Sequence, residues 1–126
     1  MTLSQAIERF DQLYPNTAPY AVKRDLLSSL EGRLSRELFS RYDPAPAETG
    51  PVSADDPGDT PLLAPFPYDD LYVKFLAAET DRLQGDVNRY LNSAAVFNEA
   101  YDALAIYLLR TRKRSSPRVK LPEVTA

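Results

Sequence analysis

Carboxylates, tyrosines and lysines are the side chains through which this chain could do chemistry, because it has no histidine and no cysteine. Serine–histidine and cysteine–histidine nucleophile pairs are therefore excluded. Zinc sites built from thiolates or imidazoles are excluded for the same reason. What remains is carboxylate chemistry, lysine chemistry or a metal held by oxygen ligands.

Two pairs of acidic residues are candidates for such a site. Asp69 and Asp70 are adjacent, and on a helix adjacent side chains point in different directions. We therefore expect them to complement the dipole at a helix start rather than to share a metal or a proton. Glu79 and Asp81 are two residues apart and do not face each other either. We interpret these two as solvated surface charges.

A long acidic segment separates the two halves of the chain. Residues 43–61 are rich in proline and glycine and hold five acids and no base. Calcium binding is one interpretation, but the spacing lacks the terminal glutamate of an EF-hand. A solvated loop is favoured, and loops of this length are usually functional or disordered. Its acids are Asp43, Glu48, Asp55, Asp56 and Asp59.

The C-terminus has the opposite charge, with six bases and no acid from residue 110 to 120. Pro117 and Pro122 block a continued helix, so we expect an extended arm over 113–126. The arm could contact phosphate, act as a solubilising tail, or dock on an acidic protein surface. That surface could be the acidic loop of the next subunit in a head-to-tail ring. The expected contact residues are Arg110, Arg112, Lys113, Arg114, Arg118, Val119, Lys120 and Leu121.

Helical periodicity dominates the first third of the chain. Thr2 and Gln5 form a predicted capping box, and Pro15 ends the helix that follows. A second helix is predicted over 19–39, with Glu31 outside its apolar face. That face is predicted to comprise Tyr20, Leu27, Leu30, Leu34 and Leu38. After the acidic loop, we expect Leu62, Leu63 and Phe66 to pin the chain to the core.

Two more helices are predicted over 68–84 and 87–111. Gly85 is the expected C-cap of the first and Asp86 the N-cap of the second, which makes an antiparallel hairpin. Apolar residues of the last helix alternate by three and four, the pattern of a long packing seam. The predicted buried residues are Leu71, Tyr72, Phe75, Leu76 and Leu83, then Val87, Tyr90, Ala94, Phe97, Tyr101, Leu104 and Leu108.

The predicted fold is all-α. We expect residues 1–112 to form a small four-helix bundle that contains the loop and ends in the antiparallel hairpin, and residues 113–126 to form the basic arm. A length of 126 residues suits one domain, and the net charge of −3 gives no general reason for nucleic-acid binding. We expect no signal peptide or membrane span, and synthesis in the cytoplasm. The tyrosines are either partner anchors or core residues with the hydroxyl at the rim. They are Tyr68, Tyr72, Tyr90, Tyr101 and Tyr107.

The stretch from Leu62 to Arg110 resembles the C-terminal half of small virion proteins of long-tailed bacteriophages. The opening LSQAIERFDQLYPNTAPY is similar to their N-terminal halves, whereas the acidic loop and the basic arm depart from them. The shared pieces are an opening motif, a Gly-Asp turn and two motifs on the last helix. They comprise Pro67, Tyr68, Asp69, Asp70, Leu71, Tyr72, Gly85, Asn88, Arg89, Tyr90, Phe97, Asn98 and Tyr101.

This resemblance implies a head–tail connector, or adaptor, located in the neck of the virion. Such proteins are small helical bundles that form a ring, commonly twelvefold, beneath the portal. They bind the portal on one side and a stopper or tail completion protein on the other, and double-stranded DNA passes through the lumen without sequence-specific binding. No cofactor and no enzyme activity are implied. An acidic lumen would repel phosphate and let DNA slide.

Two other function classes are weighed against the connector. A small regulatory or DNA-binding protein would use the basic arm, but such proteins usually carry bases on a folded face as well. Here the helices carry mixed charges. An enzyme is disfavoured by the missing histidine and cysteine. Within the virion, an all-α pattern disfavours stopper and tail-tube proteins, which resemble β-rich folds.

Overall fold

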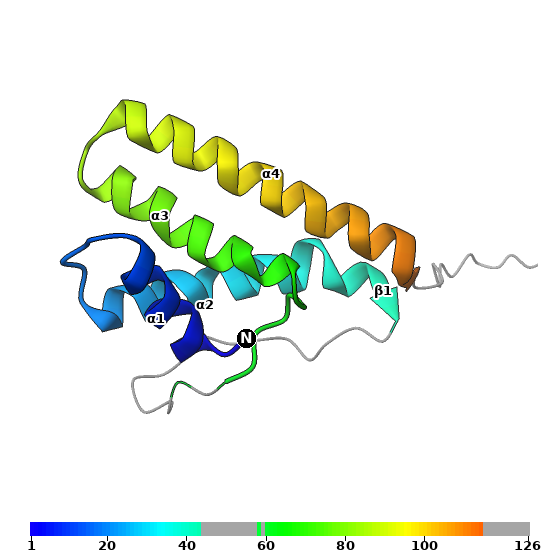
Figure 1. Ribbon diagram of the computed structural model, residues 1–126. Coiled ribbons are helices and arrows are strands. Elements are labelled where there is room, and N and C mark those ends of the chain that lie inside the picture. The colour runs from blue at the N-terminus through cyan, green and yellow to red at the C-terminus, as the bar shows by residue number, and fades with distance from the viewer. Residues whose placement is uncertain (44–57, 59, 115–126) are drawn as a thin grey trace, which may run out of the picture.

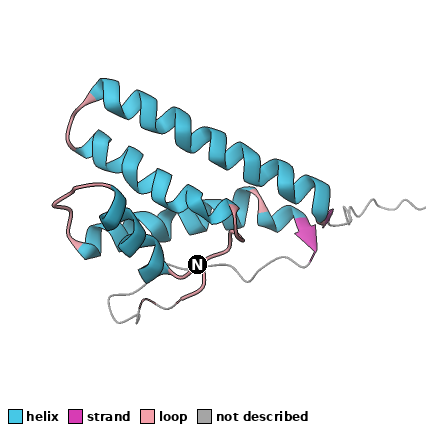
Figure 2. Cartoon of the chain, viewed as in Figure 1, coloured by secondary structure: helices cyan, strands magenta, loops and turns pink. Residues whose placement is uncertain are grey.

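A computed structural model describes residues 1–43, 58 and 60–114 of the chain. The four packed helices are α1 (Leu3–Leu13), α2 (Tyr20–Glu37), α3 (Leu71–Leu83) and α4 (Val87–Thr111). Figures 1 and 2 show α3 and α4 side by side as the longest hairpin, with α1 and α2 against α3. The all-α prediction is therefore confirmed. None of the helices in the described ranges is long and apolar enough to cross a membrane.

The caps set most of the helix boundaries. Thr2 accepts a hydrogen bond from the Gln5 backbone N–H, and the Gln5 side chain accepts one from the Thr2 N–H, so the capping box is confirmed. The second helix is shorter than predicted. Pro19, predicted inside the helix, is its N-cap residue. Phe39, predicted as the last helical residue, begins a 3₁₀ turn over Phe39–Arg41.

The hairpin turn lies where it was predicted and Asp86 is the N-cap, but the C-cap of α3 is Gln84, and Gly85 is the residue after it. Gly85 has a φ of +76°, and its N–H donates to the carbonyl of Arg82 at 3.1 Å. Asp86 then caps α4 by accepting from the Arg89 N–H at 3.1 Å. A positive φ costs glycine little, which is why this residue suits the turn. Upstream, the predicted helix over 68–84 divides into a 3₁₀ turn, Tyr68–Asp70, and α3 itself.

All four helices contribute to one core. The predicted apolar stripes are buried along most of their length, and Phe75 and Phe97 join α3 to α4 with ring centroids 5.2 Å apart. The fully buried large side chains are Leu3, Phe10, Leu27, Leu30, Leu34, Leu71, Tyr72, Leu76, Leu104 and Leu108.

Some predicted core positions are wrong. Leu83 is 59% exposed and Val87 is 66% exposed. Both flank the Gly85 turn at the hairpin tip, and a repeat position is buried only where another element lies over it. Tyr20, in the first turn of α2, is also exposed. In the other direction, Glu31 and Asp81 were expected on the surface but are buried.

The chain regions on either side of the acidic segment are bound to the folded body. Leu3 N–H donates to the Thr60 carbonyl at 3.0 Å, and Leu62 N–H donates to the Met1 carbonyl at 3.0 Å. At the other end, a two-residue strand β1 (Tyr42–Asp43) pairs antiparallel with β2 (Lys113–Arg114). The first two arm residues are extended as predicted, and they pair within their own chain.

Candidate functional site

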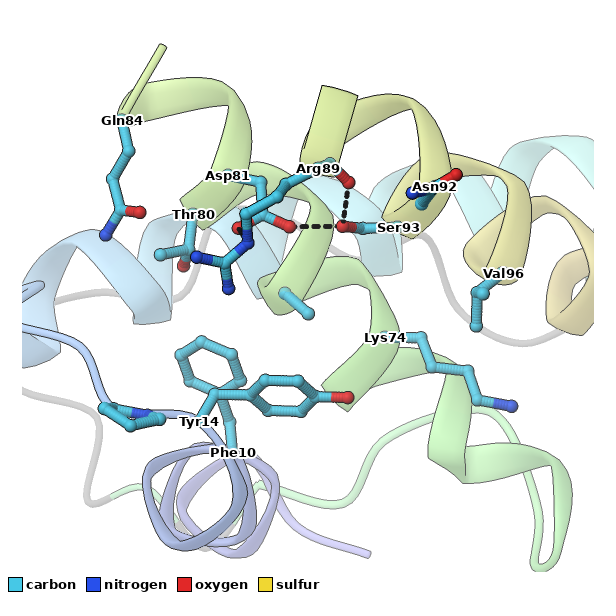
Figure 3. A pocket seen from close by; sticks show the side chains of 12 residues that line it. Phe10, Tyr14, Lys74, Thr80, Asp81, Gln84, Arg89, Asn92, Ser93 and Val96 are labelled. Atoms are coloured by element: carbon cyan, nitrogen blue, oxygen red, sulfur yellow. Dashed lines mark hydrogen bonds and ion pairs between the residues drawn. The ribbon is translucent and has the colours of Figure 1, made fainter. Parts of the chain in front are cut away.

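A groove opens between the C-terminal end of α1 and the α3–α4 hairpin (Figure 3). Its volume is about 390 Å³. Phe10 and Tyr14 lie on the α1 side, with stacked rings 5.4 Å apart, and face side chains of both hairpin helices. The lining residues are Phe10, Tyr14, Pro15, Lys74, Ala77, Thr80, Asp81, Gln84, Arg89, Asn92, Ser93 and Val96.

Polar groups tie the two hairpin helices together at the edge of the groove. Ser93 Oγ lies within hydrogen-bonding distance of the Asp81 carboxylate and 2.6 Å from the Arg89 carbonyl oxygen. Arg89 Nε lies 3.7 Å from Asp81 Oδ1. Asp81 is buried because α4 supplies these partners. These contacts join α3 to α4 at the edge of the groove.

A second polar cluster is buried where α2, α3 and the chain entering α3 meet. The Tyr72 hydroxyl donates to Glu31 Oε1 at 2.5 Å and accepts from the Ala64 N–H at 3.0 Å. Leu63 N–H donates to Glu31 Oε2 at 2.9 Å. Burial raises the pKa of Glu31, against the opposing effect of the Tyr72 hydrogen bond. Burial and the neighbouring Glu31 charge also raise the pKa of Tyr72.

A similar tyrosine–glutamate pair lies nearer the surface. The Tyr101 hydroxyl donates to Glu37 Oε1 at 2.5 Å, and the Arg33 guanidinium lies 5.4 Å from the ring centroid. Partial burial, followed by this hydrogen bond, raises the pKa of Tyr101 to about 12. The pair joins α2 to α4.

The motif over residues 67–72 makes contacts mainly within the fold. Asp69 is buried 3.8 Å from the Met1 amino group, whereas Asp70 pairs with Lys74 at 3.0 Å. The two carboxylates thus have separate partners and form no shared site. Tyr68 stacks on Tyr107 with centroids 4.6 Å apart.

The later motifs divide between core and surface. Phe97 is buried and Tyr101 is half-buried, which accounts for their apolar spacing. Tyr90 is also half-buried, whereas Asn88 and Asn98 are exposed. Most of the predicted tyrosine anchors are therefore packed against other residues. The core interpretation suits them better than the anchor interpretation.

Phe66 is the exception among the aromatic residues. We expected it to pin the loop to the core, but it is 85% exposed, so that prediction is wrong. Its neighbours on either side are held: Ala64 is buried and Tyr68 N–H donates to the Pro65 carbonyl at 2.7 Å. The sequence signal for this exposure is that Phe66 lies between Pro65 and Pro67. Two prolines restrict the backbone angles with which the chain could turn the Phe66 side chain inward.

An apolar surface stripe follows the side of α4 opposite the core. Leu91 and Leu109 are 18 residues apart, which is five helical turns, so they lie on one line. Val87 lies one turn before Leu91, and Ile106 one turn before Leu109, and all four are about half exposed or more. We call this the outer stripe of α4: Val87, Leu91, Asn98, Asp102, Ile106 and Leu109.

The described residues at the start of the acidic segment and of the basic arm lie near one another. Asp43 is the strand partner of Lys113, and the Arg112 guanidinium lies 5.6 Å from the centroid of the Phe39 ring. Arg110 is exposed on the last turn of α4. The other predicted contact residues fall outside the described part of the chain. They are Arg118, Val119, Lys120 and Leu121 of the arm, and Glu48, Asp55, Asp56 and Asp59 of the loop.

No family model, no curated protein and no solved structure matches this chain. Among residues 1–43, 58 and 60–114, no group of three or more acidic side chains comes together that could hold a metal ion. Three surface features are the candidates that the described residues offer: the groove, the exposed Phe66 and the outer stripe of α4.

Proposed function

We propose that this chain is a structural subunit of a bacteriophage virion, a head–tail connector that forms a ring in the neck. One side of the ring would bind the portal protein and the other a stopper or tail completion protein. Double-stranded DNA would pass through the lumen without sequence-specific contacts. The outer stripe of α4 is the observation that carries this proposal, together with the resemblance of the helical motifs.

The outer stripe suits a protein that is covered by neighbours in an assembly. Four large apolar side chains on one side of a long helix are exposed to water in the isolated chain. Contiguous apolar surface commonly marks a protein interface, and the stripe carries one apolar pair at each of its ends. Asn98 and Asp102 lie between the apolar ends, so the stripe has polar groups that can fix the register of a partner.

The basic arm and the acidic loop extend this proposal. The first residues of the two segments, Asp43 and Lys113, are paired in β1 and β2. We propose that the arm reaches the portal or the adjacent subunit. The loop would then face the lumen or the next neck protein.

The test uses charge placed on the outer stripe. The variant Leu91→Asp/Leu109→Asp should bind purified portal protein at least about tenfold more weakly than the wild type, since burying a charge at an interface centre is costly. Val22→Asp is the matched control, because Val22 is an exposed apolar residue on α2. Portal affinity unchanged in the stripe variant would refute the role of the stripe. Salt-dependent binding of duplex DNA, with no portal binding, would support the DNA-binding alternative instead.

A further inference from the structure

Phe66 and the groove are two separate surface features that fit each other chemically. Phe66 is the most exposed of the large apolar side chains in the described residues, at 85%. The chain on either side of it is fixed: Ala64 N–H is held by the Tyr72 hydroxyl, and Asp69 is buried. The phenyl ring is thus presented outward from a well-held segment, which lowers the entropic cost of binding.

The groove can accommodate a phenyl ring. Cavities of about 150 Å³ lined by apolar residues are large enough for benzene, and this groove holds about 390 Å³. Phe10 is fully buried beneath it, and Tyr14 and Val96 are partly exposed at its sides. The accessible Tyr14 ring offers an inserted phenyl group the offset or edge-on contacts that aromatic groups prefer.

Phe66 lies outside the groove of its own chain. The groove extends along most of α3, from Lys74 to Gln84, whereas Phe66 precedes the start of that helix and is not among the lining residues. Figure 1 shows the chain entering α3 at the end opposite the α3–α4 turn. Because the flanks of Phe66 are fixed and its ring is exposed, the ring is available to the groove of another molecule.

We propose that Phe66 of one copy inserts into the groove of a second copy of this chain. The two surfaces differ, so the contact is heterologous: a pair of subunits joined by one contact still has one free phenyl ring on one copy and one free groove on the other. Repetition of such a contact generates a closed ring or an open filament. The biological setting of this contact rests on the proposed function, for which it supplies the neighbour-to-neighbour interface.

Charge beside the two features supports this pairing. Asp70 lies four residues after Phe66 and its side chain is half exposed, although it pairs with Lys74 of its own chain. Arg89 at the groove is two-thirds exposed, although its Nε lies 3.7 Å from Asp81. An acid near the inserted ring and a base near the groove favour approach in the proposed orientation.

Two variants that each lose one half of the contact test the proposal. Phe66→Ala keeps the groove and loses the ring, whereas Val96→Arg keeps the ring and obstructs the groove. Burial of a phenylalanine side chain stabilises a contact between molecules. Each variant loses this burial, so it should self-associate roughly 10- to 100-fold more weakly than the wild type. Val22→Ala, a truncation of an exposed residue on α2, should associate as the wild type does.

Mixing the variants gives the decisive result. Phe66→Ala supplies a groove and Val96→Arg supplies a ring, so the mixture should form one-to-one dimers and nothing larger in sedimentation velocity and native mass spectrometry. The proposal is overturned if Phe66→Ala assembles as the wild type does or if the mixture stays monomeric. It is also overturned if the wild type is monomeric at about 1 mM, since a weaker contact would contribute little. Portal protein is absent from this experiment, so failure here is distinct from failure of the connector proposal.

Discussion

The buried Tyr72–Glu31 pair provides the sharpest test of how the fold is held together. Tyr72→Phe removes one hydroxyl that donates to Glu31 and accepts from the Ala64 N–H. A hydrogen bond to a charged group contributes about 1.5–3 kcal/mol, and a buried N–H left unpaired costs about 1–3 kcal/mol. We expect the variant to lose about 3–5 kcal/mol of unfolding free energy, a large part of the roughly 5–15 kcal/mol typical of a domain.

Tyr101→Phe is a matched control for this loss. Its hydroxyl also donates to a glutamate at 2.5 Å, but the partner, Glu37, is about half exposed. Water can replace the lost partner there, so we expect a loss below about 1 kcal/mol. Urea denaturation of both variants, at constant slope, measures the difference. Equal losses in the two variants would refute the argument from burial.

The same pair predicts a dependence on pH. The pKa of Glu31 is raised in the folded state, so its protonation stabilises the fold. That contribution is fully present below the unfolded value near 4.5 and is lost as pH rises through the folded pKa. The Tyr72 hydrogen bond stabilises the charged form of Glu31 and so lowers this pKa. Because Tyr72→Phe removes that bond, the variant should lose more unfolding free energy, relative to the wild type, at about pH 8 than at about pH 4. A deficit that grows on acidification would contradict this sign.

Three further predictions follow from named positions. Gly85→Ala should lose about 1–2 kcal/mol of unfolding free energy, because its φ is +76° even though no atom lies within 4 Å of an added Cβ. Gly32→Ala should gain about 1 kcal/mol, because Gly32 lies inside α2 and an added Cβ there also meets no atom within 4 Å. Thermal unfolding of the pair measures both, and equal signs would contradict the reasoning. In an ultraviolet titration of the folded protein, Tyr101 should ionise near pH 12, and Glu37→Gln should bring that value down. Deletion of residues 115–126 should leave the helical circular dichroism intact and weaken portal binding; unchanged affinity would refute the role of the arm.

Local signals predicted the helices well because each boundary has a local cause. The Thr2 capping box and the Gly85–Asp86 turn depend on residues within one helical turn of each other. The last helix was predicted over 87–111 and extends from Val87 to Thr111. A period of three and four likewise identifies Leu104 and Leu108 as core without any long-range information.

The features that the sequence prediction missed depend on distant partners. Glu31 is buried because Tyr72, 41 residues away, supplies a hydroxyl, and Asp81 because Ser93, on the facing helix, supplies another. Polar residue type alone predicts exposure, so neither burial could be read from local patterning. The groove also depends on α1 and α4 both packing against α3. Phe66 was misjudged because apolar type outweighed the constraint of its two neighbouring prolines.

Electron microscopy of the purified chain mixed with the portal protein that the connector proposal assigns to it tests that proposal most directly. The proposal predicts a ring of this chain stacked coaxially on the portal, with the outer stripe of α4 covered by a neighbouring protein. A chain that remains separate from the portal, with its outer stripe exposed, would contradict it.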